Sequence, residues 1–146
     1  MSNVTLQQAS IIVDRALAKG RELKLAPLTF VVLDAGGHQV AMKREDDSSI
    51  MRPQIAHGKA YGSLAMGVPS RVLFQRAKDN PNFISAVNAL CNGNLVPNPG
   101  GVLIRDASGA IIGAVGASGD TGDNDELCVV AGIEAAGLKA DIGAVK

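Results

Sequence analysis

The stretch GAIIGAVGASGDTGDNDE, residues 109–126, runs from an apolar segment threaded with glycine into a burst of Gly, Ser, Asp and Asn. Its glycines at 113, 116 and 119 are spaced G-x-x-G-x-x-G, and no G-K-[ST] follows, so neither common phosphate-binding pattern is met. Its acidic residues do not follow the D-x-[DN]-x-[DN]-G order of a calcium loop. We therefore predict a strand in which Gly113 and Gly116 let a helix approach, followed by a helix capped by Asp123.

This strand is the second half of a predicted β-hairpin, 102–106 and 110–116, whose turn is the ASG tripeptide. An earlier hairpin has the same form: the β-branched run at 28–35, the turn Gly36-Gly37, and a return at 38–45. We expect the two hairpins to join into one antiparallel sheet flanked by helices.

Helical spacing and capping signals predict five helices around these hairpins. Thr5 and Gln8 form a T-x-x-Q capping box at the start of the first. Ser70 is the expected cap of the third, and Asp123 with Glu126 form a D-x-x-E cap for the last. The expected ranges are 5–25, 54–67, 69–79, 80–93 and 123–138.

Composition narrows the class of protein. A chain of 146 residues fits one domain, 1–146, and 47% apolar with 19% charged residues is an ordinary globular balance. Basic and acidic residues number 14 each, which gives no electrostatic basis for binding nucleic acid or an acidic membrane. No signal peptide or run of ~20 apolar residues is visible. Cys91 and Cys128 lack metal-knuckle spacing. We predict a cytoplasmic protein with two buried thiols and no metal site.

Four motifs follow one another along the chain: D-A-G-G-H at 34–38, I-A-x-x-K-A at 55–60, P-G-G at 99–101, and a closing G-x-x-G-x-S-G…D-E…A-G segment from 113. Together they resemble the GlcG/HbpS family of small domains, which includes the C-terminal domain of PduO-type proteins. The resemblance covers roughly residues 4–138. It implies an α/β (α+β) sandwich, with a profilin-like antiparallel sheet built from two β-hairpins and flanked by helices.

The resemblance also implies a homo-oligomer, a dimer or larger, and a small-molecule ligand. Members bind heme or a corrinoid such as cobalamin, some degrade heme, and others accompany glycolate or diol catabolic genes. Heme iron needs an axial His, Cys, Met or Tyr. The first predicted helix contains no histidine. The two histidines of the chain are His38, expected in a solvated turn, and His57, on the second predicted helix.

An enzyme is the alternative that the residues themselves suggest. A pocket of His, Lys and carboxylate with backbone donors suits proton transfer, hydration or hydrolysis of a small carboxylate or carbonyl compound. Such an enzyme would be a cofactor-independent hydrolase, hydratase or lyase, or isomerase. Its catalytic candidates are His57, Lys59 and Glu126. The ligand-binding candidates are Arg44, Arg52, Asn98, Gly100, Gly101 and Asp125. A non-catalytic accessory subunit is the third alternative. The resemblance favours the small-ligand-binding domain, which we therefore predict.

Overall fold

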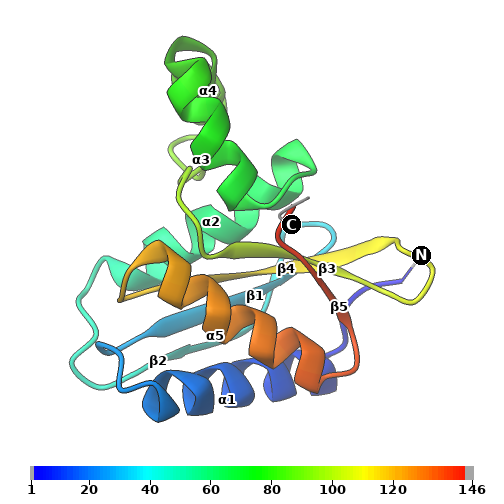
Figure 1. Cartoon of the computed structure of the whole chain (residues 1–146). Helices are drawn as coiled ribbons and strands as arrows, with labels where there is room; N and C mark the ends of the chain where they lie inside the picture. The colour runs from blue at the N-terminus through cyan, green and yellow to red at the C-terminus, as the bar shows by residue number, and fades with distance from the viewer. Residues whose placement is uncertain (1, 144–146) are drawn as a thin grey trace.

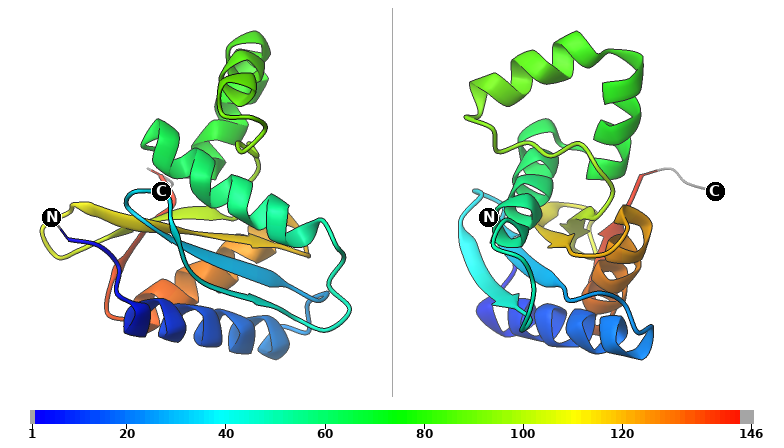
Figure 2. Two further views of the ribbon diagram at one scale, coloured as in Figure 1. Left: turned by 180° about the vertical axis from the view of Figure 1, so that it is seen from behind. Right: turned by 90° about the vertical axis from the view of Figure 1, so that its left-hand side faces the viewer.

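Five strands form one antiparallel sheet, and helices cover both of its faces (Figure 1 and Figure 2). The computed structural model describes residues 2–143, so the outermost ends of the predicted domain lie outside it. The strands are β1 (Thr29–Asp34), β2 (Gln39–Arg44), β3 (Gly101–Arg105), β4 (Ile111–Ser118) and β5 (Lys139–Asp141). The helices are α1 (Leu6–Glu22), α2 (Arg52–Met66), α3 (Ser70–Asp79), α4 (Pro81–Leu90) and α5 (Gly122–Ala135).

The expected union of the two hairpins is confirmed. The strands run in the order β2-β1-β4-β3-β5, and β1 pairs with β4 from Thr29 opposite Ser118 to Asp34 opposite Gly113. The fifth strand was not predicted. It pairs with β3 over only three residues, Lys139–Asp141, which are too few to show an alternating apolar pattern.

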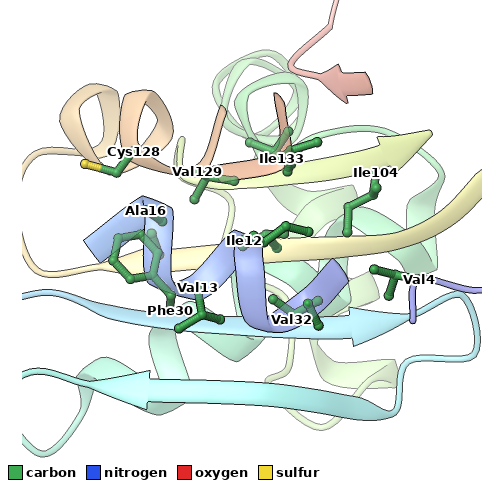
Figure 3. Packing of buried hydrophobic residues seen from close by; sticks show 14 of the residues in the cluster. Val4, Ile12, Val13, Ala16, Phe30, Val32, Ile104, Cys128, Val129 and Ile133 are labelled. Atoms are coloured by element: carbon green, nitrogen blue, oxygen red, sulfur yellow. The ribbon is translucent and has the colours of Figure 1, made fainter. Parts of the chain in front are cut away.

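Each face of the sheet has its own apolar cluster. Helices α1 and α5 cover one face, where residues such as Ile12, Phe30, Ile104 and Ile133 interlock (Figure 3). Helix α2 covers the other face. The cluster beneath α2 is small, and its buried members are Val31, Leu33, Ala56, Ala60, Leu103 and Ala114.

Helix α2 reaches the sheet so closely that a side chain is excluded between them. A Cβ on Gly116 of β4 would overlap the carbonyl oxygen of Ala56, and one on Gly101 of β3 would overlap that of Lys59. The prediction that Gly116 lets a helix approach the strand is therefore confirmed. Gly113 serves differently, because a Cβ there would overlap the carbonyl oxygen of Leu33 on the neighbouring strand.

Two of the predicted helix caps are wrong. Ser70 is the first residue of α3, after Pro69, and its hydroxyl accepts the N–H of Gly101 instead of capping. Thr121, not Asp123, caps α5 by accepting the N–H of Asn124. In both places a side chain expected to act locally is used for contact with a distant element.

The helix boundaries also differ from the expected ones. The capping box of α1 is confirmed, since Thr5 and Gln8 each accept the other's backbone N–H. Helix α1 ends at Glu22 rather than at residue 25. Helix α5 ends at Ala135 rather than at residue 138, because Gly137, with φ at +77°, turns the chain toward β5.

Helices α3 and α4 project from the sandwich on the side of α2 (Figure 1 and Figure 2). A third apolar cluster of Leu73, Ile84 and Leu95 joins them to the rest. The side chain of Leu90, the last residue of α4, is 85% exposed. Within residues 2–143, no helix combines the length and apolarity that spanning a membrane requires.

Gly116→Ala should lower the free energy of unfolding by about 3 kcal/mol, because the added methyl forces α2 away from β4. Urea denaturation measures the effect. Gly67→Ala is the control: Gly67 has φ at +70° and open space around it, so it tests backbone strain alone, about 1–2 kcal/mol. Equal losses in the two variants would contradict the close packing described for α2.

Candidate functional site

Lys59, in the middle of α2, turns into the interior and pairs with Asp125 of α5. Its Nζ lies 3.1 Å from Asp125 Oδ2 and donates to the carbonyl oxygen of Ala117 at 2.9 Å. The other carboxylate oxygen of Asp125 accepts the N–H of Asp120 at 3.0 Å. Lys59 and Asp125 are only 2% and 1% exposed. This pair therefore links helices from the two sides of the sheet at the end of β4.

Burial and mutual attraction have opposite effects on the pKa values of Lys59 and Asp125. Burial lowers the pKa of Lys59 and raises the pKa of Asp125, while the attraction between them resists both shifts. A buried pair of this kind adds little net stability compared with apolar packing, but losing one partner is costly. Its clearest role is to fix where α2 lies.

Gly100 and Gly101 surround the same lysine. A Cβ on Gly100 would lie 2.9 Å from Lys59 Nζ. The N–H of Gly101 donates to Ser70 Oγ at 2.7 Å. These two glycines therefore make room for α2, and the amide of Gly101 is already engaged.

Glu126 follows Asp125 on α5 and points toward α3. Both of its carboxylate oxygens accept from the guanidinium of Arg71, at 3.0–3.2 Å, and Asp123 binds the same guanidinium. Hydrogen bonds to Glu126, then to Asp123, raise the pKa of Arg71 further above its usual range. Arg71 was not among the residues predicted from the sequence, since no local pattern connects it with residues more than fifty positions away.

Asn98 and Arg52 lie near the Lys59–Asp125 pair, and no hydrogen bond joins the two within residues 2–143. Asn98 lines a pocket of about 250 Å³ beside Arg71, Phe74 and the first residues of α5. Arg52, at the start of α2, donates to Ser118 Oγ at 3.0 Å. The structure thus brings Lys59 and Asp125 together with Gly100 and Gly101, in a buried position rather than in an open pocket.

His57 lies on a different side of α2. It is half-buried, and its ring stacks on that of Tyr61 with centroids 5.8 Å apart. Its ring forms no hydrogen bond with any residue between 2 and 143. His38 differs, because its Nδ1 lies 3.1 Å from Asp34 Oδ1 and its side chain is 81% exposed, as expected for a solvated turn. Tyr61 was missed, although it follows His57 by four residues, the spacing of neighbours on a helix.

The flank of α2 that carries His57 faces the edge strand β2. Tyr61 reaches the β1–β2 turn, where a Cβ on Gly37 would lie 3.3 Å from its ring. Helix α2 packs over β4, β1 and β3, and leaves β2 at its margin. His57, stacked on Tyr61, therefore lies on the flank of α2 nearest the β1–β2 hairpin, where the α2-facing side of β2 is open.

Strand β2 contributes a sulfur and a cation to this open side. Met42 lies opposite Val31, and Arg44 opposite Thr29. Val31 packs beneath α2, so side-chain alternation directs Met42 and Arg44 to the face that α2 occupies. Both are exposed. Arg44 also donates to the carbonyl oxygen of Ser48 at 2.6 Å.

Ile50 precedes the first residue of α2, Arg52, by two positions and is 88% exposed. We refer to Met42, Arg44, His57 and Tyr61 as the α2–β2 surface.

Lys59→Met should cost about 3–5 kcal/mol of unfolding free energy, because Asp125 is left buried without its partner. The double variant K59M/D125N should recover part of the loss, since the orphaned charge is gone and an acceptor for Asp120 remains. Lys43→Met is the control: its pair with Asp14 is more than half exposed, so the loss should stay below about 1 kcal/mol. A loss from K59M no larger than that of K43M, in urea denaturation, would contradict this assignment.

The two cysteines should differ sharply in reactivity toward a disulfide reagent such as DTNB at pH 8. Burial raises the pKa of the Cys128 thiol to about 11, whereas Cys91 is half-exposed. The folded protein should release one equivalent of thiol and the urea-unfolded protein two. In Cys91→Ser the native signal should vanish. A persistent fast signal in that variant would show that Cys128 is accessible.

Comparison with known proteins places the chain among relatives of the same length and fold. It is 28% identical over 127 residues, 87% of each chain, to an uncharacterized 15.0 kDa protein from the dhaT-dhaS intergenic region of Citrobacter freundii. Its fold matches the PduOC:heme complex at a TM-score of 0.84, with 20% identity over 95% of this chain and 99% of the other.

A second solved structure, the Klebsiella pneumoniae protein ORFY, also matches with a TM-score of 0.84 and 20% identity, over 100% of this chain and 94% of the other. At these identities the structural matches establish the shared α+β fold. The family described as "Haem degrading protein HbpS-like" matches residues 4–134, which is most of the chain. The chain therefore belongs to the HbpS-like family.

Proposed function

We propose that the chain is a small-ligand-binding domain whose ligand is heme, bound on the α2–β2 surface with His57 as an axial ligand. Membership of a family described by heme degradation supports the choice of ligand, as does the fold shared with the protein of the PduOC:heme complex. The observation that carries the proposal is the half-buried imidazole of His57, stacked on Tyr61 and free of hydrogen bonds to residues 2–143.

The donor chemistry of this surface suits heme. An axial ligand must present an imidazole nitrogen, thiolate, thioether or phenolate to the iron. The ring of His57 has no competing partner among the described residues, whereas that of His38 is hydrogen-bonded to Asp34. Cys128 lies in the core between α1, α5 and the sheet, on the opposite face from α2. Of the two histidines, His57 is therefore the better axial candidate.

The residues near His57 suit the apolar surface and the propionates of a porphyrin. Tyr61 and Met42 offer an aromatic ring and a polarizable thioether to its apolar surface. Arg44 offers a guanidinium to a propionate. Bound heme would supply an iron centre able to take up ligands and change oxidation state. Asp125 and Lys59 do not contact heme in this proposal; they hold α2, and so His57, in place.

A titration of the full-length protein with hemin tests the proposal. The wild-type protein should give a shifted Soret band that saturates, because iron exchanges solvent for the imidazole. His57→Ala should lose that shift or bind at least about tenfold more weakly. The free energy of unfolding should change little in His57→Ala, because the side chain is half-exposed and its ring forms no hydrogen bond with residues 2–143.

His38→Ala is the matched control, since it removes the second histidine of the chain at a site outside the α2–β2 surface. Its Soret band should match the wild type. Hydroxocobalamin, offered in a parallel titration, tests the corrinoid alternative. Absence of hemin binding, or an unchanged spectrum in His57→Ala, would overturn the proposal.

A further inference from the structure

Stacking on Tyr61 is the contact that orients the imidazole of His57. The centroids of the two rings are 5.8 Å apart, and their planes are inclined by only 15°. Because the His57 ring forms no hydrogen bond with any residue between 2 and 143, no such bond selects its rotamer. On the flank of a helix, a side chain without such restraint exchanges between staggered rotamers. Whatever holds the Tyr61 ring therefore also holds the ring of His57.

The Tyr61 ring is supported by the core and by the β1–β2 turn. It packs against the buried cluster beneath α2. It also faces the turn, where a Cβ on Gly37 would lie 3.3 Å from ring carbon Cε2. A hollow of about 130 Å³, lined in part by Gly37 and Leu64, lies beside the ring. Because the ring has open space next to it, a displaced turn would leave it room to tilt away from His57.

A single carboxylate holds the β1–β2 turn. Asp34 Oδ1 accepts the N–H of Gly36 and the N–H of His38, each at 3.0 Å. The N–H of Gly37 donates to the carbonyl oxygen of Asp34, also at 3.0 Å. The contact of His38 Nδ1 with the same carboxylate adds to these backbone bonds, which do not depend on the imidazole. The conformation of the turn, and so the place of Gly37, therefore depends on Asp34.

We infer that Tyr61 is a positioning residue, which transmits the conformation of the β1–β2 turn to the imidazole of His57. The inference rests on the heme-binding function proposed above, in which that imidazole is an axial ligand. Partners outside the ligand set commonly orient metal-binding histidines, and here a stacked ring takes that place. Asp34 fixes the turn, the turn limits the ring of Tyr61, and the ring sets the orientation of His57.

Two variants of Tyr61 test the role of the ring. Tyr61→Phe keeps the stacking and should bind hemin as the wild type does, whereas Tyr61→Leu should bind it about tenfold more weakly. In the heme-free protein, the NMR signals of the His57 ring protons are identified by their loss in His57→Ala. They should shift in Tyr61→Leu, because the ring current of the neighbour is gone, and stay in place in Tyr61→Phe. Equal behaviour of the Phe and Leu variants would overturn the inference.

The β3–β4 turn offers a matched control for Asp34. There Asp106 Oδ1 accepts the N–H of Ser108 at 2.9 Å and that of Ala110 at 3.0 Å, so one carboxylate again holds a hairpin turn. A Cβ on Gly109 of this turn would meet nothing within 4 Å, whereas Gly37 faces Tyr61. Asp34→Ala should therefore weaken hemin binding at least about twofold. Asp106→Ala should leave it unchanged.

Combining the variants tests whether the turn acts through the Tyr61 ring. In a Tyr61→Leu background, Asp34→Ala should have no further effect on hemin affinity, because the turn then has no ring to limit. This comparison separates positioning from any contact of Tyr61 with the porphyrin, since Asp34 has no contact with heme in the proposed site. An undiminished effect of Asp34→Ala in that background would overturn the inference.

Gly37→Ala changes the same support without touching Asp34. Its methyl would lie 3.3 Å from the Tyr61 ring, so the ring must move by a small amount. Gly67→Ala is the control, because both glycines have positive φ, +85° and +70°, but Gly67 has open space around it. Both variants carry backbone strain, and only Gly37→Ala should shift the NMR signals of the His57 ring. Equal shifts in the two variants would contradict the proposed contact.

The outcomes distinguish this inference from the function on which it rests. Hemin binding that responds equally to Asp34→Ala and Asp106→Ala would overturn the role of the turn and leave heme binding intact. Failure of the wild-type protein to bind hemin would overturn both proposals.

Discussion

Contact between the backbone of α2 and the backbone of β4 is the constraint on which the rest of this molecule depends. At Gly116 there is no room for a methyl group against the carbonyl of Ala56. Because the helix lies so close, half of the buried side chains in the cluster beneath it are alanines, among them Ala60 and Ala114. The close approach of α2 to β4 also allows the Lys59 side chain to reach Asp125 on α5.

The same constraint separates two kinds of polar residue on α2. Lys59 is fixed inside the protein, where its ammonium donates to the carbonyl oxygen of Ala117 and to the carboxylate of Asp125. His57, only two positions away, projects from the flank of the helix with its ring nitrogens free of described partners. Rigid placement of Lys59 also fixes the position of His57 on the helix, and for this reason the proposed function is assigned to the flank and not to the buried pair.

Local sequence signals predicted the parts of the fold that depend on local chemistry. The hairpin turns at Gly36-Gly37 and at the ASG tripeptide, the Thr5–Gln8 capping box and the thinning of β4 at Gly116 all depend on neighbouring residues or on lack of a side chain. The cap predictions that failed concern side chains with distant partners. Ser70 and Glu126 have the spacing of helix caps, but Ser70 accepts the N–H of Gly101 and Glu126 accepts from Arg71.

The candidate site could be predicted only as a list of residue types. Lys59, Asp125, Gly100 and Gly101 do meet, but no sequence pattern could reveal that they meet in the interior. Nor could spacing place Met42 and His57 on the same side of the protein, because that depends on strand register and on which strand α2 leaves uncovered. Tertiary packing thus decides which of the reactive residues remain available.

The hydrogen bond between Ser70 and Gly101 has a consequence for how this domain can change over evolution. It joins the first residue of α3 to the first residue of β3, so the thirty or so residues between them leave and rejoin the sandwich at adjacent points. The segment between Ser70 and Gly101 therefore has the topology of a loop, although it contains helices. Lengthening, shortening or exchanging that segment alters one outer surface of the protein while the order and register of the sheet stay the same.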